Sequence, residues 1–360
     1  MKITIFANGV SNGGAEHVAC NLANYFVAHG YAVDLLTMAD DEPTYFIEKD
    51  VRRIILIEEK ERRSFFYNTK LRLMRIYRYC KEADTNCYIA IMQAATLSLL
   101  SMKRILKAPV IITERSNPNR YAWNKKLLLK MFVSKADACV FQNKGQIEFY
   151  KKWMGKCKTV IIPNAVSVNI NTVDWDKREK KIVAVGRLNK VKNYPMLIKA
   201  FSKIADIDKE YKLFIYGEGE ERINLDSLIK KFGLDGRVQL CGFVRNIADY
   251  IKNAKIYVLT SDYEGMPNSL MEAMSLGLAC ISTDCESGSL RELISNQRGI
   301  LVPTGNVDIL ADSLKRLIQN DSVAKVIAQN AVTVRNEFSE NNIYKKWNEI
   351  VLSSIYGGKK

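Results

Sequence analysis

The chain has 360 residues, of which 48% are hydrophobic and 26% are charged, and its formal net charge is +15. This length predicts two domains, and the balance of apolar and charged residues excludes a disordered or fibrous chain. The positive charge is concentrated in residues 1–165, where 26 Lys and Arg stand against 15 Asp and Glu. That excess indicates an anionic partner: nucleic acid, an anionic membrane surface or a phosphate-bearing substrate.

None of the eight cysteines forms a C-x-x-C pair, and Cys20, Cys80, Cys139 and Cys241 lie among apolar neighbours. This pattern predicts reduced core thiols in a cytosolic protein. Only two histidines occur, so a histidine-rich metal site is not expected. The apolar stretch at the N-terminus is too short for a signal peptide.

Strand-like apolar runs at residues 2–6, 110–113, 182–185, 212–216 and 256–260 alternate with amphipathic helical stretches. The alternation predicts an α/β fold, with parallel sheets covered by helices on both faces. Residues 85–102 carry no charge, but the polar residues among them indicate a buried strand followed by a helix rather than a membrane span.

A cationic helix is predicted over residues 70–81. Its apolar side holds Leu73, Ile76, Tyr77 and Cys80, and its cations are Lys70, Arg72, Arg75, Arg78 and Lys81. Two interpretations stay open: an ordinary solvated helix face, or a dock for a lipid-pyrophosphate acceptor at an anionic membrane surface. Aromatic residues just before the helix favour the dock, as does the Lys- and Leu-rich run at 125–130.

The two halves meet near Pro163-Asn164-Ala165, after which a polar stretch at 166–181 precedes a new strand beginning at Ile182. We therefore expect a first domain over 1–165 and a second over 166–340. The final helix, 341–360, is expected to pack back toward the first domain.

Strand ends in the second half carry polar loops, and an open parallel sheet binds its ligands there. Gly186 follows the strand at 182–185 and allows a ligand to come close, while Arg187 and Lys192 can clamp a diphosphate where other proteins use a divalent metal. A second glycine-containing loop, Tyr216-Gly217-Glu218-Gly219-Glu220, is too common a pattern to be informative alone.

Glu264 and Glu272 stand eight positions apart around a turn that opens a helix. Gly265 and Pro267 interrupt the preceding strand, and Asn268 suits the helix cap. Free N–H groups at a helix start favour an anion. Two carboxylates beside such a start suit a ligand with hydroxyls as well as phosphates, such as a nucleotide-sugar.

Together these segments resemble the retaining glycosyltransferases of family 4 (GT4, glycosyl transferases group 1). The resemblance rests on V-G-R-L from Val185, the K-N pair at 192–193, Y-G-E-G, G-F-V and the E-x7-E segment, and it extends to Gly13-Gly14-Ala15-Glu16. It implies the GT-B architecture: two Rossmann-like, doubly wound parallel-sheet domains facing across a cleft.

The resemblance also implies roles for single residues. Arg187 and Lys192 would hold the donor diphosphate, Glu264 would contact the transferred sugar, and Glu272 would accept hydrogen bonds from the ribose hydroxyls. Glu264, Arg187 and Lys192 are thus the expected catalytic residues. The other expected donor-binding residues are Gly14, Gly186, Gly217, Val244, Gly265, Met266, Asn268, Ser269 and Leu270. No cofactor, metal or protein nucleophile is expected, and the departing phosphate oxygen takes the acceptor's proton.

One segment departs from the family pattern. Many relatives carry a histidine where this chain has Arg115, within Thr113-Glu114-Arg115-Ser116-Asn117. Arginine can donate hydrogen bonds to a sugar or an acceptor phosphate, but it cannot shuttle a proton near neutral pH. The expected acceptor-binding residues are Arg115, Lys70, Arg75 and Arg78.

We therefore expect a metal-independent hexosyltransferase that uses a nucleotide-sugar, with UDP favoured, and a lipid-linked glycan at the cytoplasmic membrane face, in bacterial surface-polysaccharide or glycan biosynthesis. A sugar-nucleotide 2-epimerase of related fold is the alternative enzyme. A nucleic-acid-binding protein is suggested by charge alone, without zinc-finger or RNP spacing.

Two other enzyme classes fit the sequence less well. Gly9, Gly13 and Gly14 lack the G-x-G-x-x-G spacing of a dinucleotide oxidoreductase. A metal-dependent transferase would use a D-x-D such as Asp174-Trp175-Asp176 or Asp206-Ile207-Asp208, but such short matches are frequent by chance.

Overall fold

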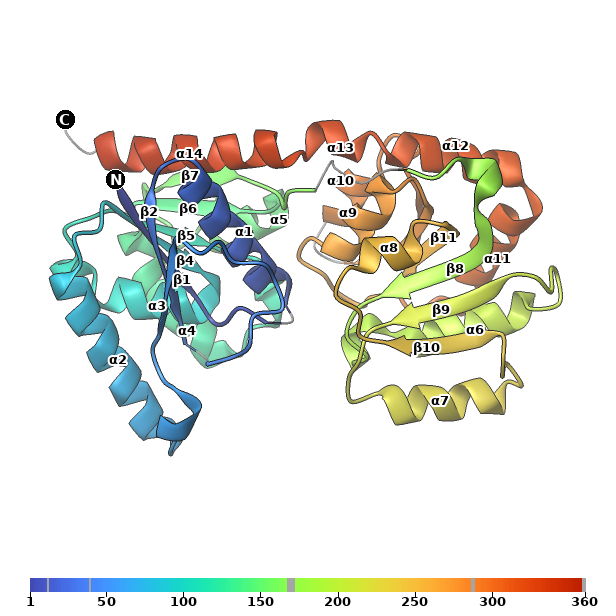
Figure 1. Cartoon of the computed structure of the whole chain (residues 1–360), viewed down its shortest axis with the longest axis horizontal. Coiled ribbons are helices and arrows are strands. Elements are labelled where there is room, and N and C mark those ends of the chain that lie inside the picture. Colours follow the sequence, from blue (N-terminus) through green and yellow to red (C-terminus); the bar gives the residue numbers. More distant parts are fainter. Residues whose placement is uncertain (12, 39, 167–171, 286–288, 358–360) are drawn as a thin grey trace. The chain divides into compact units, whose positions relative to one another are not determined.

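Two parallel sheets organise the chain. The computed structural model describes residues 1–11, 13–38, 40–166, 172–285 and 289–357. Within these residues the strands form one seven-stranded and one six-stranded sheet (Figure 1). Met1–Asn164 together with Asn341–Lys360 make one compact unit, and Ala165–Glu340 make the other. The expected architecture of two doubly wound α/β domains is confirmed.

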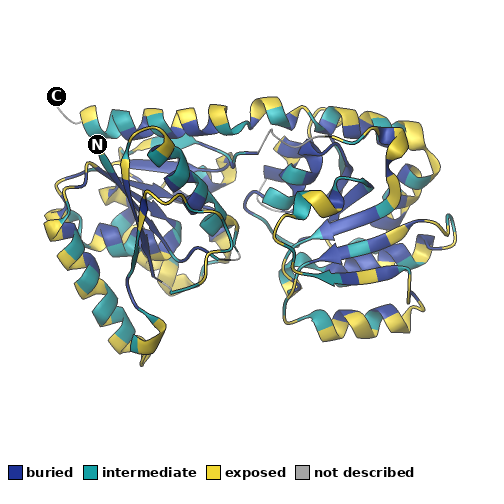
Figure 2. Ribbon diagram, in the orientation of Figure 1, coloured by how far each residue is buried: buried dark blue, intermediate teal, exposed yellow. Residues whose placement is uncertain are grey.

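The first unit is built on the seven-stranded sheet, whose order is β3-β2-β1-β4-β5-β6-β7. Its strands are β1 (Lys2–Ala7), β2 (Ala32–Thr37), β3 (Val51–Ile55), β4 (Cys87–Ile91), β5 (Val110–Thr113), β6 (Ala138–Phe141) and β7 (Lys158–Ile161). Its helices are α1 (Gly14–Ala28), α2 (Phe65–Glu82), α3 (Met92–Ser101), α4 (Trp123–Phe132), α5 (Lys144–Tyr150) and α14 (Glu340–Tyr356), with short 3-10 turns at Glu59–Glu61, Lys103–Ile105, Pro118–Arg120 and Val133–Lys135. The central strands are buried apart from Lys2 at the start of β1, as expected of parallel strands covered on both faces (Figure 2).

Helix α14 completes the first unit from the far end of the sequence. Trp347 in α14 is fully buried. The hydroxyl of Tyr31 donates to Asn348 Oδ1 at 2.7 Å, and the rings of Tyr25 and Tyr344 lie 4.9 Å apart. Lys158, at the start of β7, donates to Ser353 Oγ at 2.8 Å.

The second unit is built on the six-stranded sheet, whose order is β10-β9-β8-β11-β12-β13. Its strands are β8 (Glu179–Val185), β9 (Lys212–Tyr216), β10 (Val238–Gly242), β11 (Ala254–Leu259), β12 (Ala279–Thr283) and β13 (Ile300–Val302). Its helices are α6 (Tyr194–Ile204), α7 (Arg222–Lys231), α8 (Ile247–Ile251), α9 (Asn268–Ser275), α10 (Ser289–Ile294), α11 (Val307–Gln319), α12 (Asp321–Ala331) and α13 (Val334–Glu337), with 3-10 turns at Trp175–Lys177 and Lys190–Lys192. A continuous apolar core joins α6, α11 and α12 to this sheet.

The stretch expected to link the halves is partly integrated into the second unit. Of residues 166–181, residues 167–171 lie outside the described part. Strand β8 begins at Glu179, three positions before the expected Ile182. Just before it, Arg178 is buried and donates to the carbonyls of Ala254 and Leu276, at 2.9 and 2.6 Å. These contacts explain the earlier start, because they fix the chain against β11 and α9.

Two predictions about apolar segments are resolved in the first unit. The uncharged stretch forms buried strand β4 and then helix α3, as expected. Among the described residues, no helix combines the length and apolar character that a bilayer crossing requires.

Helix α2 is longer than predicted, and the residues on its apolar side differ in burial. Ser64 caps it, with its side chain accepting from Tyr67 N. Ile76 and Cys80 face the core, but Leu73 and Tyr77 are exposed. The four residues predicted on the apolar side therefore differ in burial, because the period of a helix does not tell how much of that side a sheet covers.

Candidate active site

The polar loops of the second unit follow four strands that are consecutive in the sheet. Strand β8 leads to Gly186 and Arg187, β9 to Gly217 and β10 to Val244, and β11 leads to the loop that carries Glu264. Parallel strands end at the same edge, so the sheet brings these residues to one edge of the unit. Arg187 is exposed there, and Val244 is half-buried.

Two of these loops approach so closely that only glycine fits. The Gly186 N–H donates to the Tyr216 carbonyl at 2.9 Å. A Cβ on Gly217 would lie 2.0 Å from the Gly186 oxygen, and a Cβ on Gly186 would lie 2.7 Å from Lys192 Cε. The φ angle is +156° at Gly186 and +139° at Gly217, and residues other than glycine rarely adopt such values. The stem of Lys192 therefore lies directly over Gly186.

The amino group of Lys192 forms an ion pair with Glu264. Lys192 Nζ lies 2.7 Å from Glu264 Oε1, and Ser261 Oγ donates to the same oxygen at 2.6 Å. The lysine and glutamate side chains are only 18% and 15% exposed. A charge pair so far from solvent is stable only when its geometry is good and its remaining valences are satisfied. This pair joins two loops that the sequence separates by 72 positions.

The backbone around both members is also fixed. Asn189 accepts from the Lys192 N–H at 3.2 Å and caps the short 3-10 turn, and Asn193 ends the turn in the left-handed conformation that asparagine tolerates. Asn193 Nδ2 donates to Asp262 Oδ1 at 2.8 Å, and Thr260 Oγ1 donates to the Lys192 carbonyl at 2.8 Å. The ion pair is thus positioned by rigid loops on both sides.

Helix α9 begins directly after this loop. Its first residue is Asn268 and its cap position is Pro267, so the expectation that Asn268 caps the helix is off by one residue. Ser289 Oγ donates to the Gly265 carbonyl, and Tyr257 Oη donates to Ser269 Oγ at 2.9 Å. The predicted neighbours Met266 and Leu270 are buried. The start of a helix presents backbone N–H groups that favour an anion.

Tyr194 borders the candidate site, and the sequence analysis did not single it out. It is buried, and its hydroxyl has no hydrogen-bond partner among the described residues. The hydroxyl lies 3.0 Å from where a Gly186 Cβ would stand, on the spot that the Lys192 stem also covers. Its position directly after Lys192-Asn193 could have indicated that it lies near the site. However, an aromatic residue at the start of a helix is usually predicted to be a core residue.

In the first unit, Gly14 begins α1 after the loop that follows β1. Asp41 holds this loop, accepting from the Val10 and Ser11 backbone N–H groups, each at 2.9 Å, and pairing with Arg53 at 3.0 Å. Gly14 itself is exposed at the helix start, where the backbone N–H groups suit an anion.

Arg115 lies in the interior of the first unit and does not reach the surface. Its Nη1 donates to the Ile162 carbonyl and to Asn164 Oδ1, both at 3.1 Å, and its guanidinium lies 5.3 Å from the Trp347 ring. Burial lowers its pKa to about 10. Nε and Nη2 have no partner among the described residues. This placement joins β5 to the chain leaving β7 and to α14.

The three α2 cations that were predicted to bind the acceptor differ in their surroundings. Lys70 and Arg78 are exposed. Arg75 instead pairs with Glu61 at 2.5 Å and donates to the Leu56 carbonyl at 2.8 Å. Arg75 therefore fastens α2 to the preceding loop.

The structure brings together Gly186, Lys192, Gly217 and Glu264 by direct contact, with the start of α9 following in the same loop. Gly14, Arg115 and the α2 cations belong to the other unit. In the part of the chain that the structure describes, no three His, Cys, Asp or Glu side chains gather as metal ligands. In the two D-x-D matches, Asp176 pairs with Lys325 and Asp208 with Lys180.

Glu272, one turn into α9, has an unusual titration. Burial raises the pKa of its carboxyl to about 7. Between the ordinary pKa of about 4.5 and this value, the folded chain binds a proton that the unfolded chain does not, so the stability supplied by the protonated acid is lost as pH rises toward 7. A ligand that donates hydrogen bonds to the carboxylate would offset this cost.

Glu272→Gln should therefore raise the melting temperature at pH 8, because glutamine carries no charge for burial to penalise. At pH 4 the Glu272 carboxyl is protonated in both the folded and the unfolded chain. The wild type and the variant should then melt at nearly the same temperature. Thermal melts of both proteins across this range measure the difference. An equal shift at both pH values would mean that ionisation is not the cause.

Two family descriptions match the chain. "Glycosyl transferases group 1" matches residues 168–334, and "Glycosyltransferase Family 4" matches residues 12–169. An uncharacterized glycosyltransferase of Methanocaldococcus jannaschii is 30% identical over 72% of this chain and 70% of its own length.

A Campylobacter jejuni relative has 24% identity over 98% of both chains. It is an α-1,4-N-acetyl-D-galactosaminyltransferase whose name gives its acceptor as a glycan on diphospho-undecaprenol. Among solved structures, Anabaena HepE in complex with UDP superimposes with a TM-score of 0.81 at 17% identity, over 98% of this chain and 100% of that one. These matches and the two doubly wound units agree on one conclusion: the chain belongs to family 4 of the glycosyltransferases and has the GT-B fold.

Proposed function

We propose that this enzyme transfers a hexose or an N-acetylhexosamine, with retention, from a UDP-sugar to a lipid-linked glycan during bacterial surface-polysaccharide synthesis. The observation that carries the proposal is the Lys192–Glu264 pair, which places a fixed cation and a carboxylate at the ligand-binding edge of the second sheet. The name of the Campylobacter relative supports a lipid-linked acceptor, and the UDP held by the HepE structure supports a uridine nucleotide.

The chemistry follows from charge placement. The bond from the sugar to the diphosphate breaks as negative charge grows on the leaving phosphate, and fixed cations stabilise that charge most where water is excluded. Lys192, Arg187 and the N–H groups at the start of α9 supply positive ends at one edge of the sheet. Glu264 then faces the sugar, and Glu272 accepts from the ribose. No metal is needed in this scheme.

Lys192→Ala and Arg187→Ala should each lower kcat by about 10²–10³, the usual cost of removing a group that stabilises transition-state charge. Lys190→Ala, which removes an exposed lysine two positions away, is the matched control and should keep its activity. UDP should raise the melting temperature of the wild type equally with and without EDTA. Near-normal rates in both variants, or a shift that EDTA abolishes, would contradict the cation clamp.

Tyr194 refines this picture. Its hydroxyl lies under the Lys192 stem with no partner in the described part of the chain, and a buried hydroxyl without a hydrogen bond destabilises the folded protein. A donor diphosphate that draws Lys192 toward itself would uncover the hydroxyl and give it a phosphate oxygen to bind. The tyrosine would then help to position the donor.

Tyr194→Phe should therefore make the protein more stable and less active. We expect a gain of about 1 kcal/mol in the free energy of unfolding and a loss of about tenfold in kcat/KM, the size of one hydrogen bond. The control is Tyr257→Phe, which breaks an existing bond to Ser269 and should lower stability. Denaturant unfolding and initial-rate assays measure both effects, and a more stable variant with unchanged kcat/KM would remove Tyr194 from the site.

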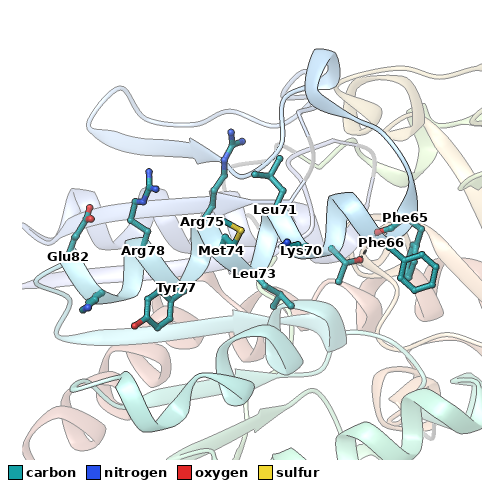
Figure 3. A pocket seen from close by; sticks show the side chains of 12 residues that line it. Phe65, Phe66, Lys70, Leu71, Leu73, Met74, Arg75, Tyr77, Arg78 and Glu82 are labelled. Carbon is teal, nitrogen blue, oxygen red and sulfur yellow. Dashed lines mark hydrogen bonds between the residues drawn. The ribbon is translucent and has the colours of Figure 1, made fainter.

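The lipid-linked acceptor is proposed to dock on the first unit, along α2. An open groove of about 1030 Å³ runs beside this helix, lined by Phe65 and Phe66 at one end and by Tyr77 and Arg78 toward the other (Figure 3). The phenylalanines are 78% and 84% exposed. Apolar side chains that alternate with cations suit the boundary between lipid headgroups and acyl chains.

Helix α4 has the same mixture of exposed apolar residues and cations as α2. Both helices pack against α3. It exposes Trp123, Leu127, Leu128 and Met131, and Lys125 and Lys130 are exposed among them. We include α4 in the proposed membrane-facing surface, together with α2.

Reversing the charge of both Lys70 and Arg78 to glutamate should weaken binding to vesicles that contain anionic lipid and raise KM for a lipid-linked acceptor at least tenfold. Hydrolysis of the donor should not change, since these residues lie outside the second unit. Reversing Lys152 and Lys156, two exposed lysines elsewhere in the first unit, makes the same change in net charge and is the control. Arg75 is a poor target because it pairs with Glu61. Equal effects of both double variants would point to net charge alone.

A further inference from the structure

Two cysteines of the first unit meet at neighbouring strands. Cys139 is in β6 and is fully buried, and Cys157 comes just before β7 and is half-buried. Their sulfur atoms lie 2.9 Å apart. Strands β6 and β7 are paired, with Cys139 opposite Thr159, so the sheet itself holds the two thiols near each other.

The contact gives the two thiols different character. The hydrogen bond between the two sulfur atoms lowers the pKa of Cys157, whereas the same contact and burial raise the pKa of Cys139. A thiolate is the nucleophile in disulfide exchange, and access decides which thiol reacts first. Cys157 is thus suited to attack, and Cys139 to resolve.

We propose that Cys139 and Cys157 form a dithiol site that a low-molecular-weight disulfide oxidises to an intramolecular disulfide. The Cys157 thiolate attacks one sulfur of the reagent, breaks its S–S bond and releases one thiolate. Cys139 then loses its proton and attacks the Cys157 sulfur, displacing the second thiolate. The protein gives up two electrons and two protons, and the reagent becomes two thiols.

The other cysteines provide a contrast within the same chain. Cys20, Cys80 and Cys280 are buried, and burial raises the pKa of each. Cys241 is half-buried like Cys157, but burial raises its pKa as well, and its thiol donates to the Gln239 carbonyl at 3.7 Å. Cys241 is therefore the natural control: an accessible thiol without the neighbour that Cys157 has.

The proposed disulfide would close a covalent ring of residues 139–157, which contains α5. That segment carries Tyr150, whose hydroxyl donates to Glu114 at 2.8 Å, and Gln146, which donates to the Ser116 carbonyl at 2.8 Å. Gln142, at its start, donates to Asn164 at 2.9 Å. A bridge from Cys139 to Cys157 would tie these polar contacts at the carboxyl end of β5 to a covalent ring.

The test is to incubate the full chain with oxidised glutathione, alkylate the remaining thiols in denaturant, and map the peptides by mass spectrometry. In the wild type, Cys139 and Cys157 should be linked to each other, with no glutathione retained on Cys157. In Cys139→Ala, which removes the resolving thiol, Cys157 should keep a glutathione. Cys241→Ser should form the same bridge as the wild type.

Retention of glutathione on Cys157 in the wild type, or free Cys139 and Cys157 after the incubation, would overturn the proposal. Because the wild type alone can give either result, the test does not depend on the folding of a variant. It is also independent of the donor site, because both cysteines lie in the first unit.

Discussion

The ion pair between Lys192 and Glu264 is the interaction on which the second unit's site depends. Neither charge would be stable so far from water without the other, and Ser261 satisfies a further lone pair of the carboxylate. The pair forms because β8 and β11 are adjacent in the sheet, which brings together loops that are distant in sequence. Gly186 is needed beneath it, since a side chain there would displace the lysine stem. The sheet order, the glycine and the two charges are thus one arrangement.

The first unit uses its arginines and lysines in two ways. Arg75 and Arg115 satisfy backbone carbonyls and hold segments together, as a planar guanidinium with several donors does well. Lys70 and Arg78 instead stand in solvent among exposed aromatic and aliphatic side chains. The excess of positive charge in this half is therefore not one uniform signal, and only its solvent-facing part is available to an anionic surface.

Much of the architecture could be predicted from sequence because parallel strands buried on both faces are written as short apolar runs, and their loops must meet at one edge. This reasoning predicted that the loops carrying Gly186, Lys192, Gly217 and Glu264 meet, and the structure has these residues side by side. It could not tell that Lys192 and Glu264 pair, nor that the Tyr194 hydroxyl has no partner among the residues that the structure describes, because both facts depend on side-chain positions across different loops.

The helical period likewise has a definite limit. It identified α2 and its cations, but whether Leu73 and Tyr77 face the core is decided by the neighbouring elements. Arg115 is a second example. Its position at a strand end suggested access to a ligand, whereas its burial depends on α14, which places Trp347 against the guanidinium.

The return of α14 to the first unit has a consequence for biosynthesis. The ribosome delivers the chain from its N-terminus, so the first 164 residues emerge well before Trp347 and Asn348 exist. Until the codons for α14 are read, Arg115 lacks its aromatic neighbour and Tyr31 its amide acceptor. Domains made of one continuous segment can fold during synthesis in the order of their sequence. Here that order is reversed: the second unit can finish while the first still waits for its final helix.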